Sequence, residues 1–69
     1  MKPKHLKRWR AIEGLTQIKA AEELDVSRRT YQDMEAGAAK IHGHIVLACA
    51  AISLGIVPAD YIKKLERGA

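Results

Sequence analysis

The sequence predicts an all-α domain, a compact bundle of about five short helices. A chain of 69 residues is long enough for one domain with one modest core. Ala, Leu, Ile, Lys, Arg and Glu dominate the composition, and runs of strand-favouring β-branched and aromatic residues are absent. Glycine, proline and turn-forming residues separate segments in which apolar side chains recur at helical spacing. These breaks divide the chain into five helical pieces.

The first helix is expected from Pro3 to about Glu13. Leu6, Trp9 and Ile12 follow helical spacing and should form its inner face, while nearby lysines remain in solvent. Gly14 suits the left-handed conformation that commonly ends a helix. Trp9 is also a possible stacking platform for a nucleic-acid base, but its place beside Leu6 favours the core.

The second helix should begin after Thr16, whose hydroxyl is well suited to cap it. Its narrow apolar face contains Ile18, Ala20, Ala21 and Leu24. Because two of these residues are alanines, we expect another helix to approach this face closely.

A tight turn over residues 25–27 should lead into a third helix from Arg28 to Ala36. Asp25 tolerates a left-handed conformation, and Ser27 can cap the helix that follows. Tyr31 and Met34 should point into the core. The opposite side is almost entirely hydrogen-bonding and consists of Arg28, Arg29, Gln32 and Asp33.

The remaining helices are expected at about 44–54 and 58–67, after a loop over residues 37–43. The first is apolar nearly all round, and a monomer of this size has too little protein to cover it. The second places Tyr61, Ile62 and Leu65 where they can pack back or meet another subunit. We therefore predict that residues 1–69 form one domain and that 44–67 form its dimerisation part, with contacts from Val46, Cys49, Ala50, Tyr61 and Leu65.

The net charge and the length of the uncharged segments indicate where in the cell the protein is expected. The formal net charge is +4, and five basic residues fall within the first ten positions, so this end should attract anions. The longest uncharged stretch, 45–59, is too short to span a bilayer, and charges interrupt the first 14 residues. The single cysteine, Cys49, allows no intrachain disulfide. These features predict a soluble, cytoplasmic protein.

The most informative segment is 17–35, in which two short helices flank a three-residue turn. The second helix of such a unit can enter the major groove of B-DNA and read base edges. Arginine can bond guanine bidentately, and glutamine can do the same to adenine. Arg28, Arg29 and Gln32 therefore have suitable chemistry on the exposed side of this helix.

Particular residues resemble those of the Cro/phage-repressor, or XRE-like, helix-turn-helix family, whose fold is lambda-repressor-like. They are Leu15-Thr16-Gln17, Ala21, Leu24, Val26-Ser27, and Glu35 followed by Gly37. The resemblance covers about residues 6–55. Three features depart from the family pattern: Asp25 replaces the usual Gly, Tyr31 replaces a β-branched aliphatic residue, and the loop 38–44 has an uncommon sequence.

The resemblance implies which residues approach DNA and which hold the fold. Gln17, Ser27, Arg28, Arg29, Gln32 and Asp33 would face the bases of the groove. It also implies a structural salt bridge between Arg10 and Glu35, which would remove Arg10 from phosphate binding.

Asp33 has two interpretations. It lies four residues after Arg29 on the same helix and can orient that side chain, or it can accept a hydrogen bond from cytosine N4. Phosphate contacts are predicted for Lys19, Thr30, Lys40 and His42. The basic N-terminal group either adds phosphate contacts or is a solvated face that contributes long-range attraction.

The sequence gives little indication of catalysis or of a metal. His5, His42 and His44 are the only candidate metal constellation, and they lack Cys or carboxylate partners at ligand spacing. No Gly-rich phosphate loop, paired-carboxylate cleft or activated nucleophile is present. We therefore predict a protein that is not an enzyme, with no cofactor, no metal and no small-molecule ligand.

Together these features predict a transcriptional repressor or autoregulator of the kind that phages and mobile elements encode. It would bind a palindromic double-stranded DNA operator as a homodimer and remain with the nucleoid while bound. One alternative is a protein-interaction module, such as a toxin–antitoxin antitoxin with secondary DNA binding, which copurification of an unrelated protein would favour. Another is an architectural binder, which would show steep salt dependence without a preferred site.

Overall fold

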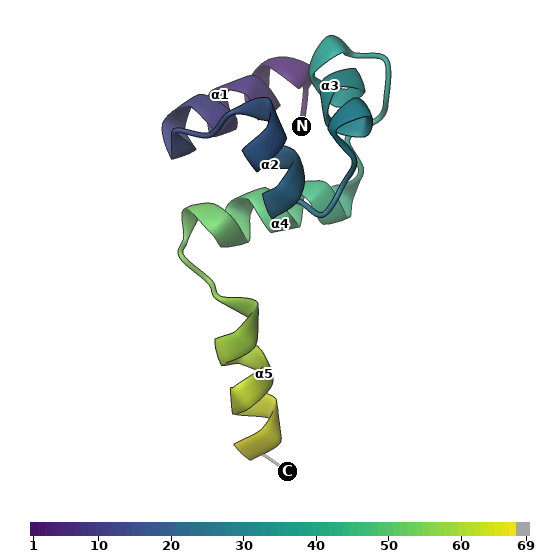
Figure 1. Cartoon of the computed structure of the whole chain (residues 1–69). Helices are drawn as coiled ribbons and strands as arrows, with labels where there is room; N and C mark the ends of the chain where they lie inside the picture. The colour runs from purple at the N-terminus through teal and green to yellow at the C-terminus, as the bar shows by residue number, and fades with distance from the viewer. Residues whose placement is uncertain (68–69) are drawn as a thin grey trace.

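A computed structural model describes residues 1–67, and these residues contain five α-helices and no strand. The helices are α1 (Pro3–Glu13), α2 (Gln17–Glu23), α3 (Arg28–Ala36), α4 (Gly43–Ser53) and α5 (Pro58–Arg67). Helices α1 to α4 form a compact body, and α5 extends from it (Figure 1). The predicted all-α class and the five helical segments are confirmed.

Local signals in the sequence set the ends of the first helices. Gly14 has a φ of 69°, in the left-handed region, and ends α1. The Thr16 side chain accepts a hydrogen bond from the Lys19 amide at 3.1 Å and caps α2. The Gly14 amide also donates to the Ala11 carbonyl at 3.1 Å. This bond and the Thr16 cap satisfy backbone groups that a helix end leaves without an intrahelical partner.

The core lies between α1, α2, α3 and one side of α4. Trp9 is 7% exposed, and its indole Nε1 donates to the backbone oxygen of Cys49 at 3.1 Å, which joins α1 to α4. Tyr31 and Met34 are buried, as predicted. The complete buried apolar set is Leu6, Trp9, Ala20, Ala21, Leu24, Tyr31, Met34, Ile45 and Cys49.

Two residues predicted on inner faces lie in solvent instead. Ile12 is 68% exposed and Ile18 is 47% exposed. The inward faces of α1 and α2 begin at Leu6 and Gln17 and continue at steps of three, four and seven residues. Ile12 and Ile18 fall to the side of these faces, and polar Arg10 and Gln17 take inward positions.

Cys49 is a correction to the predicted dimer contacts. It is 2% exposed and packs in the core of its own chain, so it does not present a surface to a partner. Burial raises the pKa of its thiol to about 11. Away from the core, Leu47 of α4 and Leu54 at the C-cap of α4 are 73% and 77% exposed. The expectation that this chain leaves part of α4 uncovered therefore holds for its outer side.

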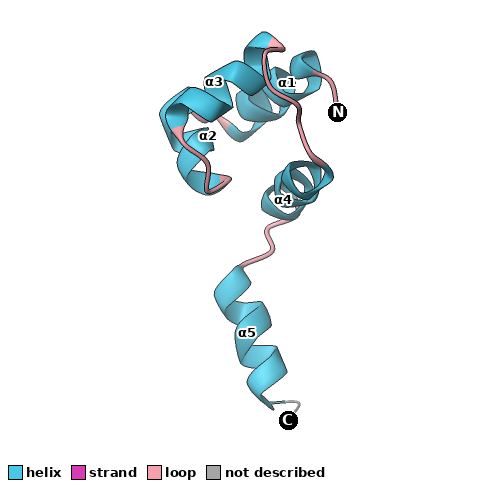
Figure 2. Ribbon diagram, turned by 90° about the vertical axis from the view of Figure 1, so that its right-hand side faces the viewer, coloured by secondary structure: helices cyan, strands magenta, loops and turns pink. Residues whose placement is uncertain are grey.

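Helix α5 stands apart from the body in two perpendicular views (Figures 1 and 2). None of its residues is buried, so it does not pack back onto α1–α4. The molecule measures 43 × 21 × 19 Å and has a radius of gyration of 13.3 Å. A compact chain of this length would have a radius of about 11 Å. The difference reflects the extended α5.

Among residues 1–67, no single helix is long and apolar enough to cross a bilayer. Helices α4 and α5 meet that length and composition test only as a pair, and the pair is bent by 91°.

Candidate nucleic-acid interface

The α2–α3 unit is joined by a tight turn that contains a non-glycine residue in a left-handed conformation. Asp25 has a φ of 55°, and its amide donates to the Glu22 carbonyl at 3.1 Å. The Val26 amide donates to the Ala21 carbonyl at 3.0 Å. These bonds close the end of α2 and turn the chain toward α3. The predicted left-handed conformation at Asp25 is confirmed.

Ser27 caps α3 with its side chain. Its Oγ accepts from the Thr30 amide at 3.1 Å, and its hydroxyl donates to Thr30 Oγ1 at 2.9 Å. Thr30 is exposed near the N-terminal end of α3. This end carries the partial positive charge of the helix dipole, which favours an approaching phosphate.

The outer side of α3 presents two arginines and one carboxylate. Arg28 is exposed, and the Arg29 side chain is 85% exposed. Arg29 Nε lies 3.5 Å from Asp33 Oδ2, one helical turn away. Such an exposed pair contributes little to stability, but it restricts the directions that the guanidinium can take. This arrangement agrees with the interpretation in which Asp33 orients Arg29.

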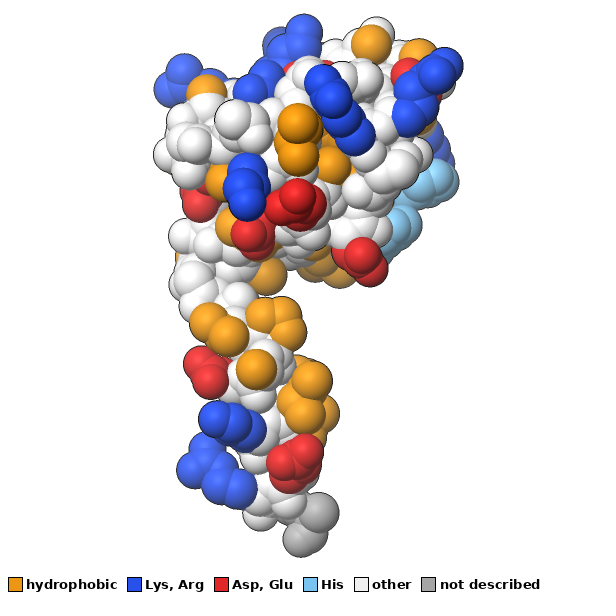
Figure 3. Space-filling model, in the orientation of Figure 1, with side chains coloured by type: hydrophobic (Ala, Val, Ile, Leu, Met, Phe, Trp, Pro, Cys, Tyr) orange, Lys and Arg blue, Asp and Glu red, His pale blue; other side chains and the backbone are white. Residues whose placement is uncertain are grey.

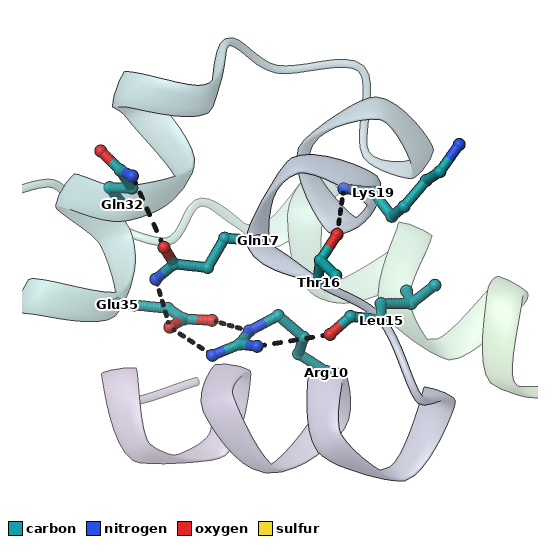
Figure 4. A network of polar contacts seen from close by, with 7 residues as sticks. All are labelled: Arg10, Leu15, Thr16, Gln17, Lys19, Gln32 and Glu35. Atoms are coloured by element: carbon teal, nitrogen blue, oxygen red, sulfur yellow. Dashed lines mark hydrogen bonds and ion pairs between the residues drawn. The ribbon is translucent and has the colours of Figure 1, made fainter.

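Behind this surface, Arg10 of α1 and Glu35 of α3 form a two-pronged ion pair (Figure 4). Arg10 Nε lies 2.7 Å from Glu35 Oε2, and Nη2 lies 3.2 Å from Oε1. Arg10 Nη1 also donates to the Leu15 carbonyl at 3.3 Å. The salt bridge that the family resemblance implied is therefore present, and it fixes α3 against α1 and the start of α2.

Burial and hydrogen bonding act in opposite directions on Glu35, whose side chain is 4% exposed. Burial alone would raise the pKa of the Glu35 carboxyl, but hydrogen bonds, the Arg10 bond foremost, outweigh burial and lower it. The bond to Glu35 raises the pKa of Arg10. Burial raises the pKa of neighbouring Tyr31 as well. Glu35 is therefore held as a carboxylate with its charge directed at Arg10.

Gln17 and Gln32 extend this network toward the outer surface. Gln17 Nε2 donates to Glu35 Oε1 at 3.1 Å, and Gln32 Nε2 approaches Gln17 Oε1 at 3.5 Å (Figure 4). Both glutamines are half-buried, so Gln32 faces α2 more than the arginines do. Sequence reasoning missed this orientation. The available signal was the spacing of three residues from Gln32 to Glu35, which places both on one side of α3.

The predicted phosphate-contacting residues are spread around the unit. Lys19 is exposed and pairs with Glu22 at 3.5 Å, and Lys40 is exposed in the loop before α4. His42 is exposed at the N-cap of α4, and its ring stacks on His44 with centroids 5.8 Å apart. No group of three potential metal ligands occurs within residues 1–67.

The remaining predicted dimer contacts lie on α4 and α5. Val46 is half-buried and Ala50 is exposed on α4. Tyr61 and Leu65 are 58% and 55% exposed on α5.

The fold and this surface define a helix-turn-helix module for binding DNA. A helix-turn-helix family model matches residues 6–52, which is 47 of the 69 residues and includes α2, the turn and α3. The chain belongs to this Cro/C1-type, XRE-like helix-turn-helix family and is a DNA-binding transcription regulator. Members of the family are typically not enzymes. Comparison with curated proteins found no match, and comparison with solved structures found none either.

Proposed function

We propose that the chain is a homodimeric repressor or autoregulator that reads a palindromic operator through the major groove. One observation carries the proposal. Helix α3 presents Arg28 and Arg29 to solvent, while Glu35 of the same helix is buried and fixed to Arg10 of α1. A helix can discriminate bases only if its backbone is held in one position while its outer side chains reach the base edges.

Direct readout is assigned first to Arg28 and Arg29, each of which can donate two hydrogen bonds to a guanine. The Asp33 carboxylate restricts the Arg29 guanidinium, so Asp33 contributes to specificity even without touching a base. We assign further base contacts to Ser27, the N-cap of α3, and to Gln17, the first residue of α2. Gln32 takes part through its amide, which lies against Gln17.

Contacts to phosphate would set the register of the module without reading sequence. We assign them to the exposed Lys19 and Lys40, to Thr30 at the start of α3 and to His42 at the N-cap of α4. Because such contacts release counterions, they should dominate the salt dependence of binding.

A dimer is proposed because one module is a weak reader. A single small DNA-binding module buries only about 600–1,000 Å² on DNA. Two modules on one duplex would double that area and would place recognition helices in successive major grooves, about 34 Å apart. Repression would then follow from occupancy, since a bound dimer blocks access of other proteins to the same DNA.

Selection from a random duplex pool at near-physiological salt tests this function. We expect enrichment of a near-palindrome with half-sites about one helical turn apart. An Arg28→Ala protein, selected in parallel, should lose preference at particular base pairs of that site. Recovery of no enriched sequence from the unaltered protein would contradict the proposal, as would enrichment that Arg28→Ala leaves unchanged.

A further inference from the structure

Two apolar surfaces of the chain lie uncovered, one on α4 and one on α5. The outer α4 stripe consists of Leu47, Ala50 and Ala51 of α4 and of Leu54 at its C-cap, and the two leucines are 73% and 77% exposed. The arm stripe of α5 contains Tyr61, Ile62 and Leu65, which are 53–58% exposed. Side chains at these spacings share one face of each helix. Orange side chains gather where the body meets the arm (Figure 3).

The connection between α4 and α5 prevents these two surfaces of one chain from meeting. Gly55 has a φ of 74°, and its amide donates to the Ile52 carbonyl at 3.1 Å. The Ile56 amide donates to the Ala51 carbonyl at 2.9 Å, which completes a hydrogen-bonded helix end. Pro58 then begins α5 with a restricted φ, and α5 leaves α4 at 91°. For α5 to reach its own α4 stripe, this turn would have to open.

We propose that the arm stripe of one chain packs onto the outer α4 stripe of a second copy, and that the second copy returns the same contact. This inference rests on the proposed homodimer and assigns its interface. Ala50 and Ala51 have small side chains and lie between two leucines on the outer α4 stripe. The larger side chains of the arm stripe would pack over these alanines. A two-fold arrangement covers both apolar surfaces of both chains at once.

The distribution of charge also favours a second copy. Helix α4 contains no Asp, Glu, Lys or Arg, so the contact buries no unpaired charge on that side. On α5, helical spacing places Asp60, Lys63 and Arg67 opposite the stripe, and Lys64 and Glu66 along its two edges. The two stripes supply seven residues per chain, so the contact would belong to the small class of interfaces.

The test introduces opposite charges on the two surfaces and mixes the resulting proteins. Leu47→Glu and Ile62→Lys change side chains that are more than half exposed. Each variant should therefore keep the helical circular dichroism spectrum of the unaltered protein and should still unfold cooperatively on heating. Sedimentation equilibrium should show a dimer for the unaltered protein. Each variant alone should dissociate at least about 100-fold more readily, because both reciprocal contacts would bury an unpaired charge.

An equal mixture of the two variants should recover a heterodimer. In that species one contact is unaltered, and the other brings the introduced carboxylate of one chain against the introduced ammonium of its partner. The matched control is Ile12→Glu, a charge at an apolar α1 position that is 68% exposed and belongs to neither stripe. It should remain as dimeric as the unaltered protein.

Three results would overturn the inference. The unaltered protein could remain a monomer into the high micromolar range, with or without an unrelated protein bound to the stripes. Leu47→Glu could remain a dimer while Ile62→Lys does not, which would indicate pairing of arm with arm. The mixture could also remain monomeric.

The interface and the operator-reading function can fail separately. Binding of the monomeric variants to a single selected half-site reports on α3 alone. If they retain sequence preference while the mixture fails to dimerise, the interface is wrong and the reading function stands. If all the proteins dimerise as expected but select no sequence, the interface stands and the reading function is wrong.

Discussion

At the scale of single residues, one buried carboxylate connects the fold to the proposed DNA-reading surface. Glu35 accepts two bonds from Arg10 and one from Gln17, and Gln17 in turn lies against Gln32. Among residues 1–67, Glu35 is the only charged side chain that is fully buried. Its loss would therefore affect both the packing of α1 on α3 and the position of the glutamines.

Glu35→Gln should lower the free energy of unfolding by about 3 kcal/mol at neutral pH, the lower end of the range for breaking a buried ion pair, because Arg10 is 27% exposed. A domain of this size has a total stability of roughly 3–10 kcal/mol, so the loss would be large. Thermal or urea unfolding measures it. The exposed Glu22→Gln, whose side chain is 62% exposed, is the matched control and should change little.

The same carboxylate should make stability depend on pH. Folding lowers the pKa of Glu35 below its ordinary value of 4.5, so the unfolded chain binds the proton more readily. The stabilisation is complete above about pH 5 and should be lost as pH falls through the lower pKa of the folded state. Unfolding curves from about pH 7 to about pH 3 should show this decline, and Glu35→Gln should show a smaller one. Equal declines in both proteins would contradict the assignment.

The proposed DNA contacts give a prediction of a different kind. Arg28→Ala or Arg29→Ala should each cost about 1–3 kcal/mol on the selected operator and should relax preference at particular base pairs. Lys40→Ala should weaken selected and random duplexes alike and reduce the salt slope of binding by about 1. Titrations at several salt concentrations measure both effects. Equal losses for the arginine variants on selected and random DNA would show that neither arginine reads a base.

At the scale of elements, the α2–α3 unit depends on short signals that the sequence displays. Thr16 and Ser27 cap the two helices, and Asp25 makes the turn between them. These features could be predicted because each involves residues within a few positions of one another. The spacing from Gln32 to Glu35 indicated which side of α3 Gln32 occupies, but its contact with Gln17, 15 residues away, depends on how α2 packs on α3.

Asp25 supplies the prediction at this scale. Its φ of 55° is costly for a residue with a Cβ atom, although Asp tolerates it better than most. Asp25→Gly should therefore raise the free energy of unfolding by up to about 1 kcal/mol. Asp25→Val should lower it, because a β-branched residue is strongly disfavoured at positive φ. Urea unfolding gives the free energy of unfolding of both variants. If both substitutions changed it in the same direction, backbone conformation would not govern stability at this position.

At the scale of the whole molecule, the chain consists of a packed body and an extended arm. The core residues all come from α1, α2, α3 and α4 and the turn after α2, and α5 buries none of its side chains. The arm therefore contributes to folding of the monomer only through its covalent connection. Its apolar stripe becomes useful when a second chain is present, according to the interface proposed above.

A chain ending at Val57 tests this division. We expect it to retain the helices of the body and a cooperative melt, because the removed residues up to Arg67 include no core residue. Trp9, whose indole is bonded to the Cys49 carbonyl, would report intact packing by fluorescence. At low micromolar concentration the shortened chain should be monomeric and should bind a palindromic operator less tightly than the full chain. Loss of a cooperative melt would show that α5 is part of the folding unit.

The number of helices, their approximate ends, the capped turn of the α2–α3 unit and the exposed arginines of α3 could all be predicted from the sequence. These features depend on local spacing and on residues that favour particular backbone conformations. Tertiary packing was needed to establish that Cys49 belongs to the core, that Ile12 and Ile18 lie in solvent, and that Gln32 turns toward Gln17. It was also needed to establish that α5 leaves the body. Helical periodicity gives the relative directions of side chains on one helix, but which direction is buried depends on where the other helices pack.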